Sequence, residues 1–236
     1  ATSIIKTAVR NRFWDRARRA AAEIEDTEKR RAALSFIQVH QIKAISLDYA
    51  DEKEDDFESI VKFVGDADVP PFAKAWGMAQ AALVAARKHT PQTSQKIAEL
   101  IDEAEDYAAH VEQGKPERVA AYGVVVMTAA RFDQPHAWRL LSELVKSANE
   151  VEDFTGDETS FNLSADENST DEAAAQFSVE AEVFRLDGIF ATMAHLDFDK
   201  ALTEARNLKG EVPQALATIA VAKSRIQESG VRSQKG

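Results

Sequence analysis

The pattern most indicative of the fold begins with Phe13-Trp14-Asp15-Arg16-Ala17 and continues through Ala20-Ala21 and Ile24 to Ala32-Ala33-Leu34 and Ile37. A similar stretch lies near the other end of the chain: Phe198-Asp199-Lys200-Ala201, then Ala205, Leu208, Gly210, Ala215-Leu216 and Ile219. If a two-residue gap is allowed at the turn, both stretches predict a short helix, a tight turn and a longer helix. A unit of this size cannot bury its apolar side alone, so we expect copies of it to stack on one another.

The composition favours a helical protein. The chain has 236 residues, of which 44% are apolar, and it contains only 9 glycines and 6 prolines. Alanine is abundant, whereas runs of β-branched residues, which are typical of strands, are nearly absent. The best candidate for a strand, Val124-Val125-Val126, is flanked by alanine pairs and fits a buried helix better.

The prolines predict where helices begin. Proline is tolerated in the first helical turn because the amide that it lacks would have no partner there. All six prolines fall where a helix should begin, directly after or within a few residues of a polar or turn-forming residue. Together with apolar spacing, they predict about ten helices joined by short turns, which makes successive helices antiparallel neighbours. The predicted ranges are 2–10, 13–25, 27–49, 54–65, 69–88, 92–112, 116–131, 135–150, 174–195, 198–208 and 211–228.

Two of these helices carry a regular apolar stripe. Ile97, Leu100, Ile101, Ala104 and Ala108 recur at three- and four-residue spacing within 92–112, and a second such set lies within 135–150. The second set is Leu140, Leu141, Leu144, Val145 and Ala148. The prediction is therefore an all-α fold, an α-solenoid of antiparallel helix hairpins.

One segment interrupts the helical pattern. Residues 151–173 are polar and acidic and have no helical period, but Phe154, Phe161 and Leu163 are expected to anchor them partly on the helices. This segment is either a tolerated surface insertion or a binding loop. We predict a single helical domain over 1–229 that includes this long acidic loop, and a disordered tail over 230–236.

The net charge of −11 argues against general binding to nucleic acid or to anionic membranes, because like charges repel. The charge is uneven, since residues 1–46 carry ten Lys or Arg against five acids, whereas 47–68 and 150–187 are acidic. This asymmetry fits either solvated faces or head-to-tail self-association. No apolar run approaches the length that a membrane-spanning helix needs.

The sequence contains no motif of a known reaction. There are no cysteines, no glycine-rich phosphate loop and no nucleophile elbow. None of the five histidines stands in a metal-binding spacing, so we predict no metal and no cofactor. A site formed by His110, His136 and nearby carboxylates is the alternative. The acidic residues of 99–106 and 51–56 are interpreted as solvated faces.

The aromatic residues are interpreted mainly as packing residues. Phe13, Trp14 and Phe198 recur at equivalent positions of the predicted repeat, so we expect them to be core anchors. Trp76, Tyr122 and Trp138, together with His136, are the candidate lining of a concave groove that binds a partner.

The paired helices and the pattern F-x-x-A, A-x-x-[IL], A-L-x-x-I resemble tetratricopeptide- and HEAT-like repeat proteins, and the unit at 198–208 resembles that of uncharacterised bacterial helical-repeat proteins. The tetratricopeptide signature W-x-x-L-G-x-x-Y is absent. The resemblance implies a right-handed superhelix that serves as a scaffold.

Three functions stay open at this point. The first is a non-enzymatic scaffold that binds a protein partner, and the second is a structural subunit of a homo- or hetero-oligomeric assembly. The third is an enzyme or small-ligand binder that uses groove carboxylates and histidines. The chain starts at Ala1, which leaves the compartment open between the cytoplasm and a secreted or periplasmic location reached after signal-peptide removal.

Overall fold

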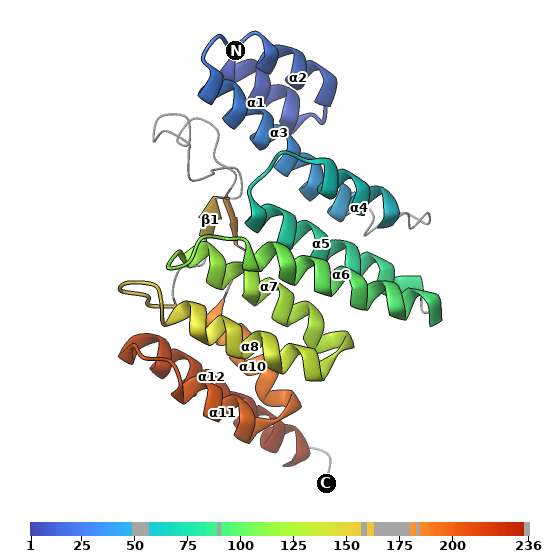
Figure 1. Cartoon of the computed structure of the whole chain (residues 1–236). Coiled ribbons are helices and arrows are strands. Elements are labelled where there is room, and N and C mark those ends of the chain that lie inside the picture. The colour runs from blue at the N-terminus through green and yellow to red at the C-terminus, as the bar shows by residue number, and fades with distance from the viewer. Residues whose placement is uncertain (49–56, 89–90, 157–159, 163–179, 183–184, 234–236) are drawn as a thin grey trace. The chain divides into compact units, whose positions relative to one another are not determined.

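The computed structural model describes residues 1–48, 57–88, 91–156, 160–162, 180–182 and 185–233 (Figure 1). These residues form eleven α-helices, one 3-10 helix and two three-residue strands, so the fold is all-α apart from one small pair of strands. Among the described residues, no helix is both long and apolar enough to cross a membrane. The helices are α1 (Thr2–Arg10), α2 (Trp14–Ala22), α3 (Thr27–Asp48), α4 (Phe57–Asp66), α5 (Pro71–Ala85), η1 (Ala86–Lys88), α6 (Pro91–Ala109), α7 (Pro116–Phe132), α8 (Gln134–Ala148), α10 (Leu186–Leu196), α11 (Phe198–Arg206) and α12 (Glu211–Ser233).

The prediction that prolines mark helix starts is confirmed. Pro71, Pro91 and Pro116 are the first residues of α5, α6 and α7, and Pro135 is the second residue of α8. Aspartates cap other starts. The side chain of Asp26 accepts a hydrogen bond from the Lys29 amide at 3.0 Å before α3, and Asp197 caps α11 in the same way through the Lys200 amide.

The predicted helix over 174–195 is wrong in its first part. Residues 180–182 form strand β2 (Glu180–Glu182), which pairs with β1 (Ser160–Asn162), and α10 begins only at Leu186. Residues 174–179 lie outside the described part of the chain. The other end of the chain also differs from the prediction, because α12 continues to Ser233 where a disordered tail was expected from residue 230.

The described residues fall into two compact units, whereas the sequence predicted one continuous domain. The first unit comprises Ala1–Ala104 with Phe161–Ala181, and the second comprises Glu105–Ser160 with Glu182–Gly236. Within the first unit, α1, α2 and α3 pack on one another, and α3 packs on α4 and α5. Gly77 of α5 permits that close packing, since a Cβ at this position would meet Val64 of α4 at 2.7 Å and Ile42 of α3 at 3.2 Å.

The second unit is also built from helix pairs. α7 packs on α8 and on α10, and α10, α11 and α12 pack on one another. The predicted stripe of α8 is buried, as is Val124-Val125-Val126 of α7, which confirms both interpretations. Of the loop 151–173, Phe154 is buried as expected, while Leu163 lies outside the described residues and nothing is described of the Phe161 side chain.

Three helices of the first unit correspond in spacing to three helices of the second. α1, α2 and α3 start at Thr2, Trp14 and Thr27, and α10, α11 and α12 start at Leu186, Phe198 and Glu211, so the offset in residue number is the same for all three pairs. We call residues 2–48 the first three-helix segment and residues 186–233 the second. Side chains at corresponding positions are buried in both, namely Ile5 and Ile189, Ala17 and Ala201, Ala21 and Ala205, Ala33 and Ala217, and Ile37 and Val221.

This correspondence corrects the alignment drawn from the sequence. The partner of Phe198 is Trp14, not Phe13, and no gap is needed at the turn. Phe13 precedes α2 and is 58% exposed, so it is not a core anchor. Trp14 and Phe198 are each half-buried, because the small side chains one turn further along each helix, Ala17 and Ala201, occupy the interior instead.

Candidate functional site

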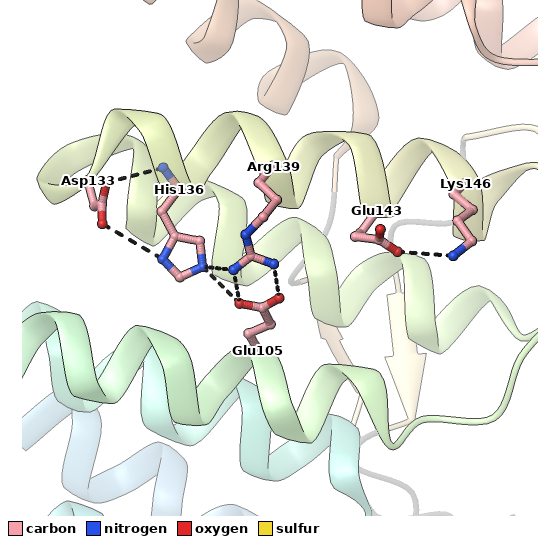
Figure 2. Close-up of polar contacts among 6 residues, drawn as sticks. All are labelled: Glu105, Asp133, His136, Arg139, Glu143 and Lys146. Atoms are coloured by element: carbon pink, nitrogen blue, oxygen red, sulfur yellow. Dashed lines mark hydrogen bonds and ion pairs between the residues drawn. The ribbon is translucent and has the colours of Figure 1, made fainter.

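A group of charged side chains in contact with one another lies in the second unit, on α6 and α8 (Figure 2). Asp133 caps the start of α8 and accepts a hydrogen bond from the His136 amide at 3.1 Å. This cap and Pro135 fix the first turn of α8, so that His136 and Arg139, three residues apart, lie on the same side of the helix. Both side chains point toward Glu105 of α6.

Glu105 is the centre of this group. The Arg139 guanidinium donates to both carboxylate oxygens of Glu105, and His136 Nε2 lies 2.8 Å from Glu105 Oε2. The second ring nitrogen of His136 lies 3.8 Å from the carboxylate of Asp133. The side chain of His136 is only 9% exposed and that of Glu105 only 20% exposed, so water screens this group less than it screens a surface ion pair.

The electrostatics of the group favour an ionised carboxylate. Burial alone would raise the pKa of Glu105, but the hydrogen bonds from Arg139 and His136, together with their charge, outweigh it and hold that pKa below its ordinary value. A carboxylate with both oxygens engaged by a guanidinium is a poor general base, because abstracting a proton would first require breaking those bonds. The geometry therefore fits a clamp that joins α6 to α8.

The Arg139 guanidinium would compete with any metal ion for the Glu105 carboxylate. A cation placed between Glu105 and His136 would have to displace the Arg139 guanidinium, which already neutralises the carboxylate. The two histidines that the sequence offered as joint ligands have different neighbours: His136 faces Glu105, whereas the exposed His110 ring lies 2.6 Å from the Asp106 carbonyl oxygen. On this chemistry the group is a structural ion network.

The residues predicted to line a partner groove belong to two different units. Trp76 lies on α5 in the first unit and is half-buried. Tyr122, Trp138 and His136 lie on α7 and α8 in the second unit, where the first two are buried. Burial raises the pKa of Tyr122, and the Lys200 ammonium sits 4.6 Å from the centre of the Trp138 ring. A groove lined by all four residues stays a prediction.

Sequence reasoning missed a polar cleft between α8 and α11. The cleft has a volume of about 380 Å³ and is lined by Ser142, Val145, Lys146, Asn149, Glu150, Glu204, Asn207 and Lys209. Ser142 donates to Glu204 at 2.8 Å, and the Asn149 side chain donates to the Asn207 carbonyl oxygen at 2.9 Å and accepts from the Lys209 amide at 2.8 Å. These bonds join residues about sixty positions apart, and polar residues near helix ends carry no periodic signal that could predict such a pairing.

Comparisons with known proteins found no relative: no family model, no curated protein and no solved structure matches the chain.

Proposed function

We propose that this protein is a non-enzymatic helical-repeat scaffold that acts by binding a protein partner. In this proposal the two three-helix segments are copies of one structural repeat, and the chain is an α-solenoid of antiparallel helix hairpins, similar in principle to tetratricopeptide and HEAT arrays. The support is the constant offset between the helix starts of the two segments and the burial of small or aliphatic side chains at the same positions in both. Stacked repeats of this kind create extended binding surfaces.

One observation carries the proposal. The last helix of the second segment, α12, exposes the large apolar side chains Val212, Ile219 and Ile226. Exposed apolar residues that recur along one helix are typical of a surface that another protein covers. The Glu105 group, in contrast, is satisfied internally and binds its own two helices together.

The same observation favours a second candidate, a structural subunit of a homo- or hetero-oligomeric assembly. The two candidates differ in whether the partner is another protein that is captured or a permanent neighbour. In both of them the function resides on a surface and not in a catalytic group.

The test is a pull-down with the full chain as bait, compared with an Ile219→Glu variant and with an Ile4→Glu variant. Both isoleucines are exposed, so both variants should fold, but only Ile219 lies on α12. A partner that is retained by the wild type and by Ile4→Glu and lost by Ile219→Glu supports the proposal. A set of captured proteins that is the same for all three baits, together with a turnover activity that depends on Glu105 or His136, overturns it.

A further inference from the structure

The polar cleft between α8 and α11 lies where both helices end. Asn149 directly follows α8, Asn207 directly follows α11, and both residues line the cleft. The C-terminus of a helix carries a partial negative charge. Lys146, in the last turn of α8, suits this position, and its ammonium already pairs with Glu143 at 3.5 Å (Figure 2). The volume of about 380 Å³ falls in the range of sites that bind small molecules or single side chains.

Glu204 does not suit this position. It lies in the last turn of α11, where the negative end of the helix dipole disfavours a carboxylate. Within the described part of the chain Glu204 makes no ion pair. Lys200, one turn earlier on the same helix, could neutralise it, but the Lys200 ammonium lies 4.6 Å from the centre of the Trp138 ring. A residue that breaks a local rule without compensation is typical of a functional site.

Neutral donors hold the Glu204 carboxylate in one orientation. The Ser142 hydroxyl donates to Oε1 at 2.8 Å, and the side-chain amide of Asn207 donates to Oε2 at 3.3 Å. Each oxygen thus accepts one bond and keeps capacity for another. Glu204 itself is partly buried, so its orientation is fixed while its charge is not neutralised. This arrangement is preorganised for a cation that carries two parallel donors.

The walls of the cleft are joined to each other. The Asn149 side chain donates to the Asn207 carbonyl oxygen and accepts from the Lys209 amide, which ties the end of α8 to the end of α11. A ligand that enters the cleft therefore does not have to draw the two helices together, and little binding free energy is lost in ordering them.

The Glu105 group shows the contact that Glu204 lacks. There the Arg139 guanidinium donates to both oxygens of the Glu105 carboxylate. At Glu204 both oxygens are positioned in a similar way, but by neutral donors, and the guanidinium is missing from the described residues.

We propose that the cleft between α8 and α11 binds the guanidinium group of an arginine on the protein partner, with Glu204 as its anchor. The planar fork of a guanidinium matches the two oxygens of a carboxylate, whereas an ammonium meets them only as a point charge. Arginine is also frequent among the residues that supply most of the affinity of an interface. The net charge of −11 speeds the encounter with a basic partner. This inference rests on the proposed function, since it names the chemistry by which the partner is recognised.

The test is a titration of the full ¹⁵N-labelled chain with acetyl-Gly-Arg-Gly-amide, followed by NMR. The side-chain amide signals of Asn149 and Asn207 should shift and saturate, with a dissociation constant on the order of 1 mM for this single side chain. Acetyl-Gly-Lys-Gly-amide carries the same charge and should bind several-fold more weakly, because it cannot engage both carboxylate oxygens in parallel.

Two variants of α11 separate the anchor from the general charge of the protein. Glu204→Gln keeps the shape of the side chain and should weaken binding of the arginine peptide at least about tenfold. Asp199→Asn removes an equal charge from the exposed first turn of the same helix, outside the cleft, and should leave binding unchanged. Circular dichroism of both variants checks that they fold.

Three results would overturn the inference. The first is an arginine peptide that does not bind the wild type, or binds Glu204→Gln equally well. The second is equal affinity for the arginine and lysine peptides. The third is that inorganic phosphate shifts the two asparagine signals while the arginine peptide does not, because the cleft would then be an anion site.

The outcomes also separate this inference from the proposed function. If the arginine peptide fails to bind but the pull-down described above still shows capture that depends on Ile219, the inference fails and the scaffold proposal survives. If the peptide binds through Glu204 but the same proteins are captured by all baits, the scaffold proposal fails. The cleft would then take a free guanidinium compound, which overturns its assignment to a protein partner.

Discussion

Ile37 and Val221 lie at the same position of the two three-helix segments, and both side chains are fully buried. The positions one helix earlier are filled by alanine in both segments, Ala17 and Ala201. A helix that presents alanine to its neighbours lets their axes approach closely, and the long helices α3 and α12 then supply the larger side chains. The two segments therefore divide the interior volume between their helices in the same way.

Ala17 and Ala201 therefore respond alike to a larger side chain. Replacing either by leucine adds volume to a filled interior, so we expect each variant to lose about 1–3 kcal/mol of unfolding free energy. Urea unfolding followed by circular dichroism measures this loss. Ala22→Leu, at the exposed end of α2, is the matched control and should cost little. Unchanged stability in the Ala201→Leu variant would show that the two positions are packed differently.

Glu105 should stabilise the second unit at pH values above the pKa of its carboxyl group. Glu105→Gln keeps the shape of the side chain but removes the charge that Arg139 and His136 face, and because Arg139 is itself more than half exposed we expect a loss of only about 1 kcal/mol. Asp106→Asn, at the next and exposed position of α6, should change stability less. Thermal unfolding near neutral pH compares the two variants.

The pH dependence of the melting temperature is a second test of the Glu105 group. The pKa of Glu105 is lower in the folded than in the unfolded chain, so the unfolded state binds its proton first as the pH falls. The stabilisation is present above the ordinary carboxylate pKa and is lost as the pH falls through the lowered one. The melting temperature of the wild type should thus drop more steeply than that of Glu105→Gln below about pH 4.5. Parallel curves would show that the ion network contributes nothing.

His40 should make the first unit sensitive to mild acid. Burial, and then the charge of Lys43, lower the pKa of His40, whose ring also packs edge-on against Phe36 at 4.6 Å. Below about pH 6.5 the unfolded chain binds a proton at His40 more readily than the folded chain does. The free energy of unfolding therefore decreases as the pH falls. We expect His40→Leu to flatten the melting curve between pH 7 and pH 5, and Lys43→Gln to flatten it only partly, because burial is the larger cause. A His40→Leu slope equal to that of the wild type would contradict this.

The parts of the fold that depend on local sequence patterns could be predicted from the sequence. Proline and apolar spacing are local, and they predicted the helix starts and the stripes of α6 and α8. The alignment of Phe13 with Phe198 was wrong because it matched two large side chains. The residues that directly precede the helices align correctly, since Phe13 precedes α2 and Asp197 precedes α11. The strand at 180–182 also had a local signal, since Val179-Glu-Ala-Glu-Val183 alternates with the period of a strand.

The candidate sites were harder to predict, because they join residues distant in sequence. Arg139 and Glu105 are both ordinary charged residues of amphipathic helices, and only the three-dimensional fold brings their side chains into contact. The exposed apolar residues of α12, Val212, Ile219 and Ile226, recur every seven residues, which is a local signal. Their exposure could not be predicted, because a second apolar face on the same helix, which includes Ala217 and Val221, packs inside the unit.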